Sequence, residues 1–346
     1  MATNSTGRRP RRPVSFLPYM NTAAISPVLI SLIILISGCV SNSADEQERW
    51  DITAQTDFGR QPRWSPLGGT ILFGDDTPGR TGLWLWQPGQ SPQPAADSLP
   101  AHNWDYRWSP DGSRIAFTCP GEAGADSSGI WIISVDDGTL SRIYDRGRDV
   151  CWSPGSDSVV VRVDHPTSGA AGIYAVDGVS GRAELRVSGG FKPICSPKLD
   201  WLAFSDGEIN GQLHLAGGDL SKIVTGAGAN QWEWSGDGRL LFCVVNNYPS
   251  DIVRGDVWRI AVNGDSVSVD TAIVSWAAYP APDATGGQVA MQRTSTSRWV
   301  GVWIYRASEG EVQIADYGQN PSFDPTGDRV AVNANGGGIR VLTRVK

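Results

Sequence analysis

Short apolar segments, separated by clusters of Pro, Asp and Gly, recur along this chain and predict short β-strands joined by tight turns. One stretch shows the pattern clearly, with strand-like segments at 106–109, 114–118, 129–135 and 139–144. Between the first two lies Pro110-Asp111-Gly112-Ser113, in which Pro presets φ and Gly tolerates positive φ, so we expect a β-turn there. The pattern therefore predicts a unit of four strands.

A tryptophan-centred phrase opens this unit and recurs along the chain. Its clearest copy is Arg107-Trp108-Ser109-Pro110-Asp111-Gly112, and the Trp is taken as the marker of each repeat. Successive markers are 39 to 46 residues apart, a period typical of a β-propeller, in which each repeat forms one four-stranded blade. The seven markers are Trp64, Trp108, Trp152, Cys195, Trp234, Pro280 and Phe323.

The two ends of the repeat array predict how the ring closes. The last repeat offers three strand-like segments before Lys346, and an extra segment at 50–55 precedes the first repeat. We expect 50–55 to form the outer strand of the last blade, since such a closure leaves only short protected edges. The predicted fold is all-β: a propeller of seven four-stranded blades over residues 50–346. Six blades with one degenerate motif remain the alternative, because the copies at Cys195 and Pro280 are weak.

Large side chains recur at one position of the third strand in each repeat. We interpret this column as packing between blades rather than as a set of sugar-binding platforms, because stacked blades need bulky side chains at equivalent positions. Its members are Trp84, Trp131, Tyr174, Leu213, Trp258, Trp303 and Arg340.

The N-terminal segment is predicted to direct export rather than to join the fold. A basic stretch at 8–12 is followed by an apolar run at 23–36 and then by Ser37-Gly38-Cys39, and small residues before a cleavage point mark a secretory signal peptide. The run is shorter than the ~20 residues of a spanning helix, although an uncleaved membrane anchor remains the alternative. The segment resembles a bacterial lipobox, which implies a signal peptide at 1–38 and lipidation of Cys39. Residues 39–49 would then be the lipidated cysteine and a polar linker.

Charge restricts the class of partner. The net charge is −7, and without residues 1–38 the chain keeps 25 basic against 36 acidic side chains. Such a surface repels phosphate backbones, so nucleic-acid binding is not expected. We expect no cofactor, contact with the membrane through the lipid anchor only, and an envelope protein or peptide as partner.

Residues suited to metal binding or catalysis are few. The histidines His102, His165 and His214 lie in different repeats without ligand spacing, so no metal site is predicted. A Gly-x-Ser-x-Gly element in a strand–turn–helix context is missing, which disfavours a hydrolase. Four cysteines lie in strand register and are predicted to be free buried thiols, with Cys119–Cys151 as the pair to check for a disulfide. They are Cys119, Cys151, Cys195 and Cys243.

The Trp-Ser-Pro-Asp-Gly phrase, followed by Gly129-Ile130-Trp131, resembles the TolB-like, or PD40, branch of WD40-like propellers over residues 50–346. Nothing in the chain matches the α/β domain that precedes the propeller in TolB, so the role of TolB is not carried over. In related propellers the loops from second to third strands and from fourth to first strands share one face. Loops on a rigid scaffold often carry binding residues, and Tyr, Trp and Arg are typical anchors. The candidate binding residues on this loop face are His102, Tyr106, Arg146, Arg148, His165, Asn246, Asn247, Tyr248, Arg254, Arg293, Arg298 and Trp299.

The sequence thus predicts an extracytoplasmic β-propeller, lipid-anchored to a bacterial membrane, that binds a protein or peptide at the cell envelope without catalysis. Two alternatives stay open: a propeller enzyme acting on carbohydrate at the channel mouth, and a small-ligand sensor. Convergence of several ionisable side chains on one cavity would favour the enzyme.

Overall fold

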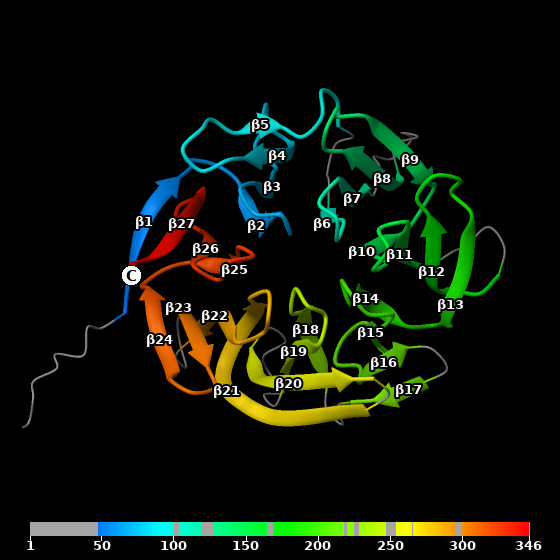
Figure 1. Cartoon of the computed structure of the whole chain (residues 1–346). Coiled ribbons are helices and arrows are strands. Elements are labelled where there is room, and N and C mark those ends of the chain that lie inside the picture. The colour runs from blue at the N-terminus through cyan, green and yellow to red at the C-terminus, as the bar shows by residue number, and fades with distance from the viewer. Residues whose placement is uncertain are drawn as a thin grey trace, which may run out of the picture. The chain divides into compact units, whose positions relative to one another are not determined.

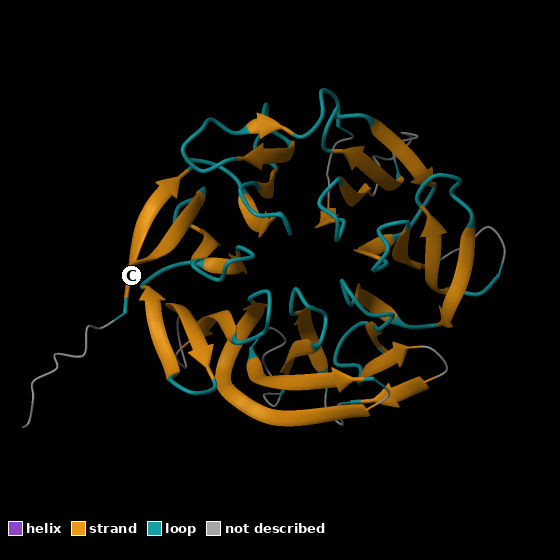
Figure 2. Cartoon of the chain, viewed as in Figure 1, coloured by secondary structure: helices purple, strands orange, loops and turns teal. Residues whose placement is uncertain are grey.

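The computed structural model describes residues 48–99, 104–119, 128–164, 169–217, 220–224, 228–246, 254–264, 266–294 and 299–345. The chain divides into Met1–Gln47, which lies outside these ranges, and the unit Glu48–Lys346. All regular secondary structure described in this unit is β-strand, arranged as sheets in a ring (Figure 1; Figure 2). Across the described ranges, the chain forms no helix long and apolar enough to cross a membrane.

The strands follow one another around the ring in chain order, and neighbours within each sheet are antiparallel. The first blade contains β2 (Arg60–Trp64), β3 (Ile71–Asp75), β4 (Gly82–Trp86) and β5 (Gln93–Pro94). The second contains β6 (Trp104–Trp108), β7 (Arg114–Cys119), β8 (Gly129–Ser134) and β9 (Leu140–Tyr144). The third contains β10 (Arg148–Trp152), β11 (Ser158–Val163), β12 (Gly172–Asp177) and β13 (Ala183–Ser188). The fourth contains β14 (Phe191–Cys195), β15 (Leu202–Ser205), β16 (Leu213–Gly217) and β17 (Leu220–Ile223).

A seven-stranded sheet follows, made of β18 (Ala229–Trp234), β19 (Leu240–Val245), β20 (Gly255–Asn263), β21 (Ser266–Pro282), β22 (Gln288–Thr294), β23 (Trp299–Arg306) and β24 (Gly310–Ala315). Its central strand, β21, pairs with β20 through its first part and with β22 through its last part. We treat β21 as the outer strand of the fifth blade and the inner strand of the sixth. With the last sheet, of β25 (Gln319–Phe323), β26 (Arg329–Asn333) and β27 (Ile339–Val345), this division gives seven units.

The N-terminal strand closes the ring as predicted. β1 (Arg49–Gln55) pairs with β27, so the last sheet has the order β1-β27-β26-β25. Glu48, just before β1, accepts hydrogen bonds from Arg306 Nη1 at 2.6 Å and Nη2 at 2.8 Å, and lies 2.7 Å from Arg344 Nε. Backbone pairing and a partly buried ion cluster therefore hold the two ends of the array together.

The marker positions share one place in the register. Each pairs with the residue seven positions later, as in Trp64↔Ile71 and Phe323↔Val330. In the sixth repeat this pair is Pro282↔Val289, which corrects the predicted marker Pro280 to Pro282. The sequence pattern gave the wrong position there because the usual serine after the marker is replaced. Asp283 takes its place and organises the turn after Pro282.

Three of the four marker tryptophans donate a hydrogen bond to the preceding blade at the inner edge of the ring, whereas the buried Trp64 Nε1 has no partner within the described ranges. The indole Nε1 of Trp108 donates to the carbonyl of Arg63, and that of Trp152 donates to the carbonyl of Arg107, both at 3.1 Å. Trp234 makes the same 3.1 Å bond to Ile194. In each case the acceptor is the residue just before the marker of the preceding blade, so the recurring Trp is explained by packing between blades.

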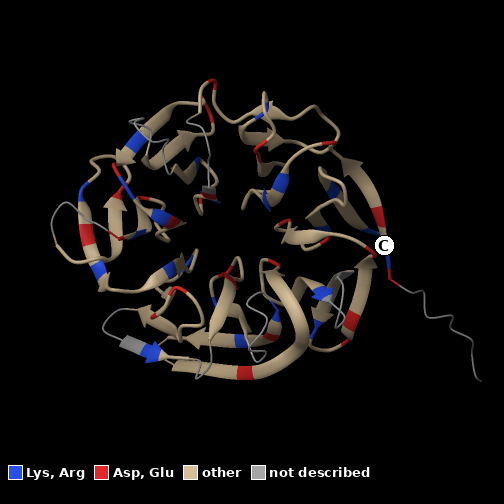
Figure 3. Cartoon of the chain, turned by 180° about the vertical axis from the view of Figure 1, so that it is seen from behind, with Lys and Arg blue, Asp and Glu red and all other residues tan. Residues whose placement is uncertain are grey.

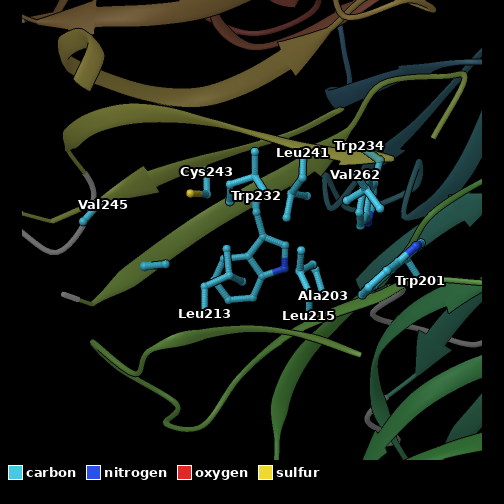
Figure 4. Packing of buried hydrophobic residues seen from close by; sticks show 12 residues of the cluster. Trp201, Ala203, Leu213, Leu215, Trp232, Trp234, Leu241, Cys243, Val245 and Val262 are labelled. Carbon is cyan, nitrogen blue, oxygen red and sulfur yellow. The ribbon is translucent and has the colours of Figure 1, made fainter. Parts of the chain in front are cut away.

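The apolar core lies between blades, and the column of large third-strand residues belongs to it. Figure 4 shows the cluster between the fourth and fifth blades, where Leu213 and Leu215 face Trp232, Leu241 and Cys243. The other column members from Trp84 to Trp303 lie in equivalent clusters, which confirms the packing interpretation.

One cysteine prediction is wrong. Cys151 and Cys195 form a disulfide with their Cα atoms 5.6 Å apart, whereas Cys119 and Cys243 are buried and not disulfide-bonded, as predicted. The reason lies in the marker geometry. Cys195 holds the marker position of the fourth blade, and Cys151 is the residue before the marker of the third. A disulfide therefore joins the two positions that elsewhere share the indole–carbonyl hydrogen bond.

Candidate functional site: the central channel

The first strands of the seven units line a central channel of about 700 Å³. These strands are β2, β6, β10, β14, β18, the last part of β21, and β25, which Figure 1 shows nearest the centre of the ring. Basic and acidic residues both occur on them, as the colouring of the ribbon in Figure 3 shows. The channel is therefore the place where residues from all blades converge.

The residues three positions before the markers form a polar ring, here called the mouth ring. Six of its seven residues have a left-handed backbone, with φ between 47° and 56°. In six of the units a register shift of the inner strand spans this position, so the residue forms a bulge that re-aims its side chain. A left-handed conformation costs a non-glycine residue about 1 kcal/mol or more, and such strain often occurs at functional sites. The mouth ring consists of Gln61, Asp105, Asp149, Lys192, Gln231, Tyr279 and Asn320.

The residues one position before the markers form a second ring, here called the waist ring. Its charged members are Arg63, Arg107 and Glu233, and one carboxylate oxygen, Glu233 Oε2, faces both arginines. Arg63 Nη1 lies 3.3 Å from this oxygen and Arg107 Nη2 lies 3.9 Å from it. Two guanidinium groups thus share one carboxylate inside the channel. The waist ring consists of Arg63, Arg107, Cys151, Ile194, Glu233, Ala281 and Ser322.

Electrostatics differ between the two rings. Burial, together with the positive charge of Arg63, lowers the pKa of Arg107 to about 10, so Arg107 remains charged at neutral pH. Its Nε is buried without a hydrogen-bond partner among the described residues. At the mouth ring, burial raises the pKa of Asp149 to about 6, with a further contribution from the carboxylate of Asp105. Asp149 Oδ2 is likewise buried and without a partner within the described ranges.

Replacing Asp149 by Asn should stabilise the protein at pH 7.5. Because the folded-state pKa of about 6 exceeds the ordinary 3.8, the folded protein binds more protons between these values and loses stability as the pH rises through them. The neutral amide avoids this loss, so we expect a gain of about 1–3 kcal/mol at pH 7.5 that disappears near pH 4. Thermal unfolding at both pH values measures it, with the exposed Asp97→Asn as control. A gain of the same size at both pH values would contradict the assignment.

The predicted candidate Tyr106 proves to be a structural residue. Its side chain is buried, and its hydroxyl accepts a hydrogen bond from Gly74 N at 3.0 Å. The hydroxyl also lies 2.9 Å from the carbonyls of Arg60 and Gln61, in the neighbouring blade. Tyr106 therefore connects two inner strands, and its hydroxyl is engaged in hydrogen bonds to the neighbouring blade.

Four predicted arginines are described, and they occupy different surroundings. Arg148, next to Asp149, contacts Asp164 at 2.9 Å and Glu208 at 2.8 Å, which joins the third blade to a second-to-third-strand loop of the fourth. Arg146 is exposed and lies 3.4 Å from Asp145. Two others stack on tryptophans, Arg254 over Trp276 at 6.0 Å and Arg293 over Trp303 at 5.6 Å.

The rest of the predicted loop face is mostly outside the described residues. Asn246 is described through its backbone N–H, which donates to Gly228 O at 2.8 Å. Outside the description lie the lipidation candidate Cys39, the side chain of Trp299, and His102, His165, Asn247, Tyr248 and Arg298.

Sequence reasoning missed the charged residues of the channel. Arg63, Arg107 and Glu233 all stand directly before a marker, and Asp105 and Asp149 stand three positions before one. Reading these columns across repeats could have found them, because the same strand register puts each column at one level of the channel. Within the described ranges, no group of three His, Cys, Asp or Glu residues is placed to hold a metal ion. His214 instead contacts Asp206 Oδ2 at 3.1 Å and stacks on Phe204.

Comparison with known proteins supports the fold. No family model and no curated protein matches this chain. Among solved structures, oligogalacturonate lyase from Vibrio parahaemolyticus is similar with a TM-score of 0.65 at 11% identity, covering 86% of this chain and 97% of that one. An oligogalacturonate lyase in complex with manganese is similar with a TM-score of 0.61 at 13% identity, covering 87% and 97%. The Cps50 (Swd1) propeller domain from Myceliophteria thermophila has a TM-score of 0.63 at 12% identity, covering 85% and 100%. The chain is thus an all-β propeller, similar in fold to both an enzyme and a WD40 domain.

Proposed function

We propose that this chain is an exported, lipid-anchored β-propeller that binds a protein or peptide at the cell envelope. The observation that carries the proposal is the channel, in which side chains from several blades converge and two atoms of charged groups, Arg107 Nε and Asp149 Oδ2, have no hydrogen-bond partner among the described residues. Propellers share a scaffold and differ in what their channel and loops present, so the proposal rests on this site rather than on the fold.

The disulfide supports the exported location. Disulfides persist in oxidising compartments outside the cytoplasm, and Cys151–Cys195 joins adjacent blades at the channel wall. Together with the lipobox-like segment before Cys39, it favours a protein tethered to the outer surface of a membrane. The mouth ring and the surrounding loops would then face the partner.

One observation favours the alternative of an enzyme acting on carbohydrate at the channel mouth. A carboxyl group whose pKa lies near 6, such as that of Asp149, is suited to proton transfer near neutral pH. A glycan screen with the intact chain and Asp149→Asn addresses it directly. Turnover that is lost in the variant would replace the binding function by catalysis.

Crosslinking and pull-down from native membranes tests the binding function. We expect the intact chain to capture a specific partner, and a channel variant with Asp149→Asn and Arg107→Gln to capture at least tenfold less. Arg186→Gln, on the outer strand β13 and 3.7 Å from Asp200, is the matched control and should capture as much as the intact chain. Equal capture by the channel variant would overturn the proposal, and no specific partner for the intact chain would rule out a protein partner.

The tether is tested separately in the same cells. Changing Cys39→Ala should move the protein from the membrane fraction to the soluble fraction, because one side chain carries the predicted lipid. Retention of the variant in the membrane fraction would contradict lipid anchoring while leaving the binding result unaffected.

A further inference from the structure

We propose that the channel binds short peptides with free termini, with the peptide carboxylate at Arg63 and Arg107 and the peptide ammonium at Asp105 and Asp149. This inference rests on the proposed binding function and names its ligand class. The arrangement of charge at two levels of one channel, given by the waist and mouth rings, carries it.

The waist ring has an excess of positive charge and free donors. Arg63 and Arg107 share the single oxygen Glu233 Oε2, and the 3.9 Å separation on the Arg107 side is too long for a hydrogen bond. Arg107 makes one long contact besides, from Nη1 to the carbonyl of Tyr106 at 3.5 Å, and its buried Nε has no described partner. A carboxylate can accept two parallel N–H bonds from such a guanidinium, which is the strongest form of this interaction.

The two arginines are held in place before a ligand arrives. Their backbone carbonyls accept the indole hydrogen bonds of Trp108 and Trp152. The inner strands that carry them are thereby fixed to the next blade. A preorganised pair of donors loses less entropy on binding than a flexible surface pair.

The mouth ring has the opposite excess. Asp105 and Asp149 come from adjacent blades and repel each other, and Lys192 is the one basic residue of the ring. The neighbouring Arg148 is engaged by Asp164 and Glu208. Asp149 Oδ2 is buried with no partner among the described residues, so an ammonium group would supply the missing donor.

The distance between the mouth ring and the waist ring restricts the length of the ligand. Asp105 and Arg107 are two residues apart on β6, which corresponds to at most about 6–7 Å along a regular strand and to less across the bulge at Asp105. A simple anion would meet the repulsion of the mouth ring, and the two charges of a free α-amino acid are too close together. Dipeptides and tripeptides place an ammonium and a carboxylate one or two peptide units apart, at about 3.8 Å between successive Cα atoms.

Calorimetric titration of the full chain with dialanine and trialanine tests the proposal without any substitution. We expect saturable binding of at least one of them, and a loss of at least tenfold for its N-acetylated form and for its C-terminal amide. Free alanine and sulfate should bind at least tenfold more weakly than the better peptide. Absence of saturable binding by both peptides, or equal affinity of the blocked forms, would overturn it.

Two substitutions test which ring binds which end of the peptide. Arg107→Gln should abolish the difference between the peptide and its amide, and Asp149→Asn should abolish the difference between the peptide and its N-acetyl form. Arg186→Gln should change neither difference, and Arg63→Gln replaces Arg107→Gln should that variant fail to fold. Differences that persist in both channel variants would overturn the assignment.

The two proposals fail separately. Capture of an envelope protein without binding of either peptide would refute this inference and retain the proposed function. Peptide binding that requires both free termini, without capture of any protein, would support this inference and identify small peptides as the ligand.

Discussion

Deleting residues 48–55 should destabilise the propeller by about 5 kcal/mol or more, which is comparable to the whole stability of many domains. The deletion removes β1 and leaves β27 as an unpaired edge. It also removes Trp50, which packs on the cluster of the sixth and seventh blades. Arg306, only 7% exposed, would lose the carboxylate of Glu48 and keep the more exposed Glu309, and weakening a buried ion cluster is destabilising.

Chemical denaturation and limited proteolysis of the two chains measure this effect. The control is Arg49→Ala, which changes an exposed side chain of the same strand and should be nearly neutral. Glu48→Gln separates the ion cluster from the strand pairing, and we expect it to account for a minor part of the loss. A deleted chain that unfolds at the same denaturant concentration as the full chain would show that the ring does not depend on β1.

Replacing Trp152 by Ala should cost about 3–5 kcal/mol of folding free energy, the range for large aromatic truncations in a core. Its side chain is 3% exposed and packs in the cluster shared by the second and third blades. The Arg114 guanidinium lies 4.9 Å from its ring centroid, and the indole donates to Arg107. Equilibrium denaturation followed by tryptophan fluorescence and circular dichroism measures the loss.

Trp108→Ala is the matched comparison. Trp108 makes the same indole bond to the preceding blade but is only partly buried beside the channel, so we expect it to cost about 1–3 kcal/mol. By the sequence motif alone the two residues are equivalent, whereas their different burial predicts different losses of folding free energy. Equal losses for the two variants would show that the marker hydrogen bond, rather than buried area, governs their contribution.

The channel residues show which parts of the candidate site can be found by comparing equivalent positions of the repeats, and which cannot. Arg107 and Asp149 were not selected as candidates, because each belongs to a different repeat and neither forms a chemical motif within its own blade. Their common site exists only because the inner strands converge on one axis. Tyr106 is the opposite case: the sequence predicts that it binds a partner, and the structure shows its buried hydroxyl in hydrogen bonds between blades.

Strand periodicity, turn chemistry and bulky side chains for packing are local requirements that each repeat must meet, so the residue pattern predicts the repeat unit, the strands, the packing column and the closure by 50–55. The sixth marker, the Cys151–Cys195 bond and the charge rings of the channel became visible only in the folded ring. The disulfide and the charge rings join residues 44 positions or more apart, and their contacts depend on how the blades are placed around the axis. Local pattern specifies a blade, whereas the distances between blades, and therefore the site, follow from closing the ring.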